Sequence, residues 1–416
     1  MKIIFISLIT LMLLGSGLAY AANEYTNSAH GSTTRGVDRT STPQYGTGNC
    51  AHCHEQHASI NGTEPDPTGG PDIYLGFALE QNLCLGCHGG TPNYSNNAYP
   101  HDINTDITKT SKHDLTNSDT AHRANETLAQ LAVTKHVECT DCHNPHEAIT
   151  GNHVAGTTGN AVSNALKAVS GAVPTFSGSN WTAPTAYNLQ TATKEHEICF
   201  KCHSSANANL TTWDSSWTNV GLEFSTSNQS YHPVAGALTG GGSSALDADQ
   251  MLAPWKVGTG TDSQGTKTMY CSDCHGDSAD DTTAGPHGSG SPRILKGRWP
   301  TNSSAYLWDL DDAEFGTNSF NTECLCKNCH PIFPWQNEAH STSRHSGGYK
   351  CVQCHVGLPH GSNFGRLIAD KSKLHPYDYG DTGSGGYADI TAFTKAAEPL
   401  AGYSASNCTA PDCSPH

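Results

Sequence analysis

The chain has 416 residues and a formal net charge of −16. Leu, Ile, Val and Phe together make up less than a fifth of it, a composition that by itself would suggest disorder and offers little material for a side-chain core. The acidic balance disfavours nucleic acid as a partner, because proteins that bind nucleic acid usually carry basic patches.

Residues 1–21 predict an export signal. Lys2 supplies a positive start, an apolar run covers 3–14, and Ala19-Tyr20-Ala21 forms a small-residue cleavage site. The apolar run is shorter than a helix that crosses a bilayer. No later segment approaches that length either, so we expect no membrane span in the mature chain.

Seven C-x-x-C-H motifs dominate the rest of the sequence. Numbered one to seven in chain order, they occupy 50–54, 84–88, 139–143, 199–203, 271–275, 326–330 and 351–355. In such a motif two thiols add across the vinyl groups of a haem, and the adjacent imidazole becomes the proximal ligand of the iron. Zinc is the alternative, but zinc sites do not need a histidine directly after the second cysteine every time. We therefore expect seven covalently bound haems c.

The motifs assign most cysteines a role. The predicted thioether residues are Cys50, Cys53, Cys84, Cys87, Cys139, Cys142, Cys199, Cys202, Cys271, Cys274, Cys326, Cys329, Cys351 and Cys354. The predicted proximal ligands are His54, His88, His143, His203, His275, His330 and His355. The remaining cysteines leave two alternatives open, a Cys408–Cys413 disulfide or a disulfide of Cys324 with either of them, with one thiol left over.

The haems also decide the predicted fold class. Flat apolar macrocycles can supply the core that the side chains lack, so folding should depend on them. We expect a multihaem cytochrome c of mostly irregular coil with short α-helices, very little β structure and a core formed by the chain of seven haems.

The predicted elements and regions follow in chain order. After the signal, 22–240 forms a four-haem region, 241–365 a three-haem region that begins after the glycine-rich 240–243, and 366–416 a C-terminal tail. Short helices are expected over 72–82, over 118–135 with Ser118-Asp119 as its cap, and over 390–397. Motifs three and four recur at a similar spacing as five and six, which indicates a haem-pair unit used twice.

The sixth iron position decides what each haem can do. Only Met251 and Met269 lie outside the signal, whereas the 24 histidines leave more than two per haem beyond the proximal ones. We therefore expect bis-histidine ligation at all or nearly all sites, which gives low-potential haems with both faces closed. The distal candidates are His30, His57, His122, His136, His146, His196, His232, His287, His345 and His360.

Several motifs carry a family resemblance. They are C-T-D-C-H-N-P-H at 139–146, C-A-H-C-H-E-Q-H-A-S at 50–59, G-P-H-G-S at 285–289 and P-H-G-S at 359–362. The chain resembles the exported multihaem c-type cytochromes with doubled CxxCH motifs of metal-reducing bacteria, and is similar to the outer-surface Omc-type members that form extracellular filaments. The resemblance covers most of 28–365. It implies alternating stacked and T-shaped haem pairs and one distal histidine from a neighbouring subunit, for which His30 is the candidate by position.

These observations favour electron transfer along a chain of haems over catalysis. The expected protein is an extracellular or cell-surface cytochrome that polymerises with itself and passes electrons to other redox cytochromes, metal oxides or external electron acceptors. A monomeric periplasmic shuttle is the alternative. A multihaem nitrite or hydroxylamine-type oxidoreductase is disfavoured, because such an enzyme needs an open or specially ligated iron, no C-x-x-C-K motif occurs and histidines are in surplus.

Overall fold

A computed structural model describes part of the chain, and all structural statements below concern that part. The described residues are 24–39, 45–54, 80–89, 102–115, 126–133, 135–238, 251–256, 267–277, 285–297, 325–330, 355–356, 358–370, 372–374, 377, 390 and 392–393. The expected export signal, the glycine-rich boundary, Cys324, Cys351, Cys354, Cys408, Cys413, His57, His122 and His345 lie outside them.

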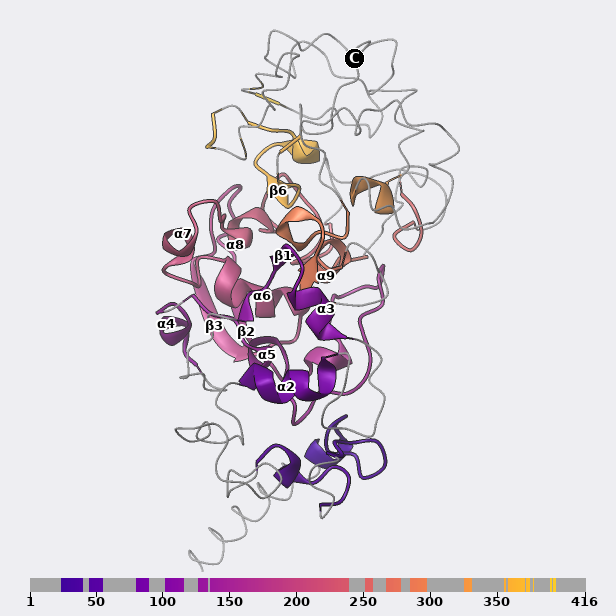
Figure 1. Cartoon of the computed structure of the whole chain (residues 1–416). Coiled ribbons are helices and arrows are strands. Elements are labelled where there is room, and N and C mark those ends of the chain that lie inside the picture. The colour runs from indigo at the N-terminus through magenta and orange to yellow at the C-terminus, as the bar shows by residue number, and fades with distance from the viewer. Residues whose placement is uncertain are drawn as a thin grey trace, which may run out of the picture.

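The described segments follow one another along the long axis of the molecule. Figure 1 shows the first segments at one end, the labelled helices and strands in the middle, and the segments near β6 (Gly361–Ser362) towards the other end. No helix among the described residues is long and apolar enough to cross a bilayer.

Motifs one to six, which lie within the described residues, fall in short helices or helical turns. Motifs two and four lie in the two nine-residue helices α2 (Glu80–His88) and α6 (Glu195–His203). Motifs three and five form single turns, α5 (Cys139–Cys142) and α9 (Cys271–Cys274). Motifs one and six lie in 3₁₀ turns, η1 (Cys50–His52) and η8 (Leu325–Asn328).

An aspartate closes each of the single turns α5 and α9. Asp141 accepts the backbone N–H of Glu138 at 2.8 Å, and Asp273 accepts that of Tyr270 at 2.7 Å. This bond satisfies a donor at the helix start that would otherwise have no intrahelical partner. The C-[TS]-D-C-H sequence therefore encodes its own cap.

The remaining helices are one turn or slightly longer. They are α3 (Ile103–Ile107), α4 (Leu128–Leu131), α7 (Leu210–Trp213) and α8 (Val220–Glu223), with further 3₁₀ turns η3 (Asn164–Leu166), η5 (Pro292–Ile294) and η10 (Gly365–Leu367).

The longest strands form a hairpin that the sequence analysis did not predict. Strand β2 (Ser170–Thr175) pairs antiparallel with β3 (Ala186–Thr191), with Ser170 opposite Thr191. The hairpin packs on α6 (Figure 1), and Ala172 of β2 and Phe200 of α6 are fully buried. Pairing between polar, weakly alternating strands is hard to read from sequence, because it depends on what covers one face.

Two short strand pairs join segments that are far apart in the chain. Strand β1 (Ser111–Lys112) pairs with β5 (Gly288–Ser289), and β4 (Ser230–Tyr231) pairs with β6. Both pairs cross the boundary that we expected near residue 240. They therefore tie the first predicted region to the second.

The apolar core of the described residues surrounds α6. Phe200 lies in one buried cluster with Trp255, Met251 and Met269. The two methionines outside the export signal are thus packing residues of this cluster, with 7% and 4% of their surface exposed.

Two of the predicted helices need correction. The helix expected over 118–135 does not run through 126–135, because Thr127 is an N-cap in extended conformation and α4 ends at Leu131. A complete capping box between Thr127 and Gln130 starts a new helix there. The expected helix over 390–397 is also wrong where the structure describes it, since residues 390, 392 and 393 are not helical.

Candidate functional site

Six of the predicted proximal histidines each face a second histidine. The pairs, with the distances between ring centroids, are His54–His146 at 5.8 Å, His88–His30 at 6.1 Å, His143–His287 at 6.0 Å, His203–His113 at 6.1 Å, His275–His360 at 6.1 Å and His330–His232 at 6.4 Å. Each pair brings together residues that are distant in the sequence.

The separation of the facing rings fits one metal ion between them. A histidine nitrogen binds a metal at about 2.0 Å, and the ring centre lies about 1.2 Å behind that nitrogen, so two imidazoles on opposite sides of an ion have centroids about 6.4 Å apart. The observed range of 5.8–6.4 Å is close to this value. The residues present therefore fit an iron with histidine on both faces.

Hydrogen bonds fix the orientation of three of the second histidines. Nδ1 of His30 lies 3.0 Å from the carbonyl oxygen of Pro145, and Nδ1 of His113 lies 2.7 Å from that of Pro286. His232 makes the same contact with Pro359. An Nδ1–H that donates to a carbonyl leaves the Nε2 lone pair for a metal, which is the usual arrangement of ligating histidines.

The motif histidines of motifs three, five and seven use a different carbonyl. Nδ1 of His143 lies 3.0 Å from the oxygen of Ala165 in η3. Those of His275 and His355 lie 2.9 Å from the oxygens of Arg293 in η5 and Arg366 in η10. Both arginines have positive φ, 62° and 59°, which turns the backbone so that the carbonyl meets the ring.

Burial keeps these imidazoles neutral. It lowers the pKa of His88, His232 and His275 to about 4, with neighbouring histidines adding to the effect. Burial lowers the pKa of His203 to about 3. At neutral pH such rings carry a free lone pair, as a metal ligand must.

One facing histidine has a carboxylate partner. Nδ1 of His360 lies 2.5 Å from Oε2 of Glu223, whose side chain is fully buried. Burial raises the pKa of Glu223, but the hydrogen bond and charge of His360, together with hydrogen bonds from Thr218 and Tyr377, outweigh burial and bring the pKa below its usual value.

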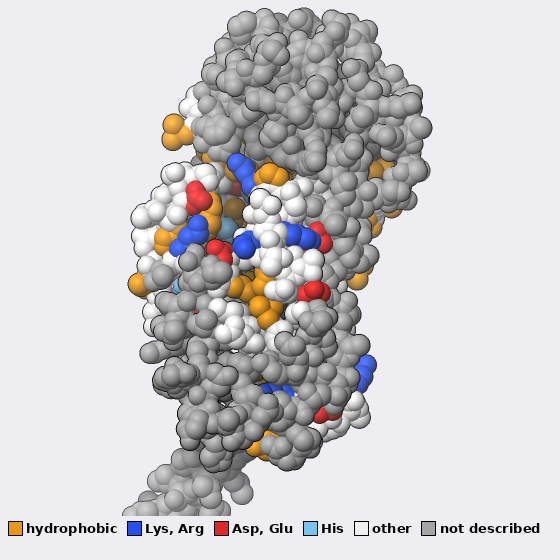
Figure 2. Space-filling view, in the orientation of Figure 1, with side chains coloured by type: hydrophobic (Ala, Val, Ile, Leu, Met, Phe, Trp, Pro, Cys, Tyr) orange, Lys and Arg blue, Asp and Glu red, His pale blue; other side chains and the backbone are white. Residues whose placement is uncertain are grey.

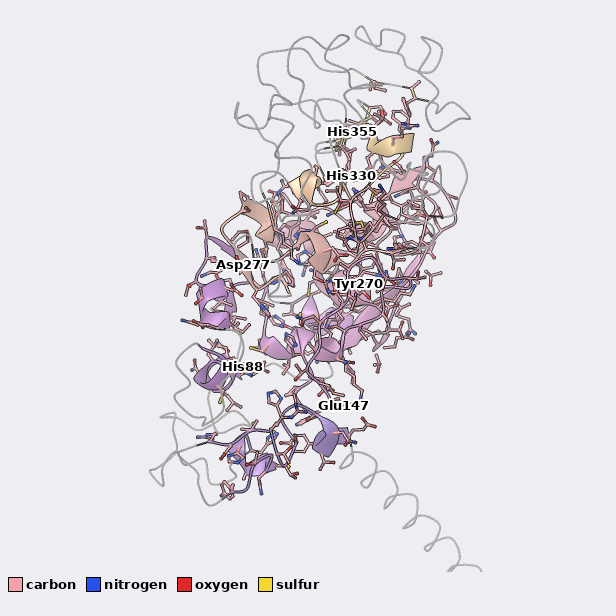
Figure 3. The ribbon with its side chains drawn as sticks, turned by 90° about the vertical axis from the view of Figure 1, so that its right-hand side faces the viewer. His88, Glu147, Tyr270, Asp277, His330 and His355 are labelled. Carbon is pink, nitrogen blue, oxygen red and sulfur yellow. The ribbon has the colours of Figure 1, made fainter. Side chains whose placement is uncertain are left out.

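The motif cysteines place consecutive motifs next to one another. Side chains of motifs two and three form a hydrogen bond through Cys84 and Cys139, and those of motifs four and five through Cys199 and Cys271. Burial raises the pKa of Cys53, Cys142 and Cys329, and Cys87, Cys202 and Cys274 of the adjacent motifs add to the shift through their charge. Motifs one to six therefore lie side by side in chain order. Figure 3 agrees, with His88 near one end and His330 and His355 near the other.

Two buried glutamates hold neighbouring motifs together. Thr140 of motif three donates its backbone N–H and its hydroxyl to Glu80 of α2, at 2.8 and 2.6 Å. Ser272 of motif five donates the same two groups to Glu195 of α6, at 2.9 and 2.8 Å. Each glutamate lies four residues before the first cysteine of its own motif, so the same set of hydrogen bonds between neighbouring motifs occurs twice.

Some predicted distal histidines lie elsewhere. His136 lies outside any helix or strand, with Nε2 3.4 Å from Oε2 of Glu126. His196 is buried on α6 and packs on Phe200, with ring centroids 5.0 Å apart. Position before a motif was the reason to expect both as distal candidates, and that position leaves each close to its own helix instead of a haem face.

The sequence analysis missed His113 and assigned His30 a different partner. His113 faces His203, and His30 faces His88 of its own chain rather than a neighbouring subunit. Both belong to a shared S-x-H sequence, which occurs at 28–30, 111–113, 230–232, 343–345 and 414–416. Of these histidines, His30, His113 and His232 make the same contact with a Pro carbonyl.

Comparison of the chain with family models, with curated proteins and with solved structures found no match. The argument for function therefore rests on the motifs and on the geometry of the facing histidines.

Proposed function

We propose that this chain is an electron-transfer protein that carries seven haems c, with histidine on both faces of the iron at each described pair. The observation that carries the proposal is the set of six facing histidine pairs, each built on the last residue of a C-x-x-C-H motif. Bound haem would supply one-electron chemistry at its iron.

The chain's own residues would hold the haems and close their faces. The motif cysteines would tether the rings through thioethers, and the buried imidazoles would occupy both axial positions. A site closed on both faces has no position for a substrate, which favours an electron carrier over an oxidoreductase. The adjacency of motifs one to six in chain order supports a single line of haems.

Replacing His113 tests the ligation. In purified holoprotein, His113→Ala is expected to convert one haem from low-spin to high-spin, because the iron of motif four loses one of its two imidazoles. Haem content is measured as the pyridine haemochrome, with seven haems expected per chain, and spin state by electron paramagnetic resonance.

His153→Ala is the matched control. Nε2 of His153 donates to Oδ1 of Asp273 at 2.8 Å, and the ring stacks on Tyr270 rather than on a proximal histidine, so all haems are expected to stay low-spin. A holoprotein without covalent haem, or an unchanged spectrum in His113→Ala, would contradict the proposal.

The proposed setting is the cell exterior, with the chain assembled into a homopolymer that hands electrons to other redox cytochromes, metal oxides or other external acceptors. Support comes from the sequence of 1–21 and from the low share of charged residues, 14%. On the face in Figure 2, basic, acidic and apolar side chains of the described residues are interspersed. Electron microscopy of native protein decides: filaments support this assembly, and particles of one chain support a periplasmic shuttle.

A further inference from the structure

A buried carboxylate joins the histidine that faces motif five to a tyrosine. Glu223 accepts from Nδ1 of His360 at 2.5 Å through one oxygen and from the hydroxyl of Tyr377 through the other. The Glu223 side chain is 0% exposed and that of His360 is 19% exposed. Water therefore competes little with either bond.

The backbone fixes this contact. Asn219 caps α8, accepting from the N–H groups of Gly221 and Leu222 at 3.1 and 3.4 Å, and Glu223 ends the helix. The residue after His360 must be glycine, because a Cβ on Gly361 would lie 1.9 Å from the carbonyl oxygen of Glu223. The distance between the carboxylate and the imidazole is thus set by packing of β6 on α8.

In the other copy of this framework the equivalent carboxylate pairs with a lysine. A Cβ on Gly288 would lie 1.9 Å from the carbonyl oxygen of Asp106, so Asp106 is the equivalent of Glu223. Its carboxylate accepts from Lys109 at 2.8 Å, and Lys109 also pairs with Asp277 at 2.5 Å. The negative charge is compensated there by lysine instead of being directed at an imidazole.

A carboxylate acceptor makes a ligating imidazole more basic, and a more basic ligand stabilises oxidised over reduced iron. We propose that Glu223 lowers the reduction potential at motif five by strengthening His360 as a donor, and that Tyr377 limits this effect by drawing on the same carboxylate. The inference rests on the proposed function. The site exchanges one electron with a neighbouring haem site or an external one-electron donor, and the proton on Nδ1 stays in place.

Substitutions of Glu223 and of Tyr377 should shift the reduction potential in opposite directions. Glu223→Gln is expected to raise one transition in a spectroelectrochemical titration of the holoprotein, by about tenfold in the one-electron equilibrium, which is about 59 mV. Tyr377→Phe is expected to lower the same transition, because the carboxylate loses a competing donor. A merely structural role would not give opposite signs.

His360→Met identifies the transition, since methionine in place of histidine raises the potential of that site. Asp106→Asn is the matched control and should leave this transition in place. If His360→Met moves no transition, the proposed function fails. If it moves one that Glu223→Gln leaves unchanged, or that Tyr377→Phe moves upward, only the inference is overturned.

Discussion

Each facing pair depends on hydrogen-bonding groups that fix the orientation of an imidazole ring. A histidine side chain has two torsions and two nitrogens, so its position alone does not decide which nitrogen faces a metal. The carbonyl oxygens of Pro145, Pro286 and Pro359 accept hydrogen bonds from Nδ1 of three of the facing histidines. Nε2 of each of these rings is then left to point towards the opposite histidine. Proline suits this place because its fixed φ limits the backbone directly before a second facing histidine.

His196 shows what the same burial does to a histidine that faces no proximal ring. Burial lowers its pKa to about 3, with the charge of Lys194 contributing. As the pH falls through about 6.5, His196 takes up a proton in the unfolded chain but not in the folded chain. The free energy of unfolding is therefore highest above that pH and decreases as the pH falls towards 3. The loss is about 1.4 kcal/mol per pH unit at most.

His196→Gln is therefore expected to flatten the pH dependence of the unfolding free energy between about pH 6 and pH 4. The measurement is denaturant unfolding of the holoprotein at several pH values. Asn188→Ala, at an exposed position without a titrating group, should keep the original slope. Equal slopes in His196→Gln and the parent chain would refute the assignment.

At the scale of elements, the chain repeats one construction. A strand with the sequence S-x-H pairs with a strand from a P-H-G-S sequence. The serine hydroxyl of the P-H-G-S sequence both accepts and donates hydrogen bonds around a turn that contains an arginine with positive φ. Ser289 donates to the Leu295 carbonyl at 2.7 Å, and Ser362 to that of Ile368 at 2.6 Å. The two copies share hydrogen bonds as well as residue types, so the repeat in the structure goes beyond the repeat of motif spacing in the sequence.

The hydrogen bonds between a buried glutamate and the neighbouring motif can be tested by substitution. Glu195→Ala removes the acceptor for two groups of Ser272 and leaves both buried, which should lower the unfolding free energy by about 2–4 kcal/mol. Glu147→Ala removes a half-exposed carboxylate 3.7 Å from Lys167, and should cost under about 1 kcal/mol. Chemical denaturation of the holoproteins compares them; equal midpoints would show that these hydrogen bonds add no stability.

Sequence could locate the motif cysteines and their histidines, because the C-x-x-C-H pattern is local. It could not choose the facing histidines by nearness to a motif, since His287 reaches His143 only through the pairing of β1 with β5. The same limit misplaced His136 and left out His113. Helix α6 and the cap of α5 were within reach of sequence; the β2–β3 hairpin was not, because long-range packing decides it.

Across the whole molecule, histidines that follow one motif face the histidine of an earlier motif. His146, just after motif three, faces motif one; His287, after motif five, faces motif three; and His360, after motif seven, faces motif five. Each reaches back by one haem-pair unit. The chain is therefore held together in series, every unit supplying a histidine to the one before it.

We expect His57 to extend this series beyond one chain. It follows His54 in C-H-E-Q-H as His146 follows His143 in C-H-N-P-H. By the same backward step His57 would serve an odd-numbered motif one unit earlier, which in a homopolymer is motif seven of the neighbouring copy. His57→Ala is then expected to abolish filaments in electron micrographs and to make one haem high-spin, with added imidazole restoring low spin without restoring filaments. His153→Ala should keep both properties. Filaments that persist in His57→Ala with every haem low-spin would rule out this junction, because the neighbouring copies would then be joined without that ligand.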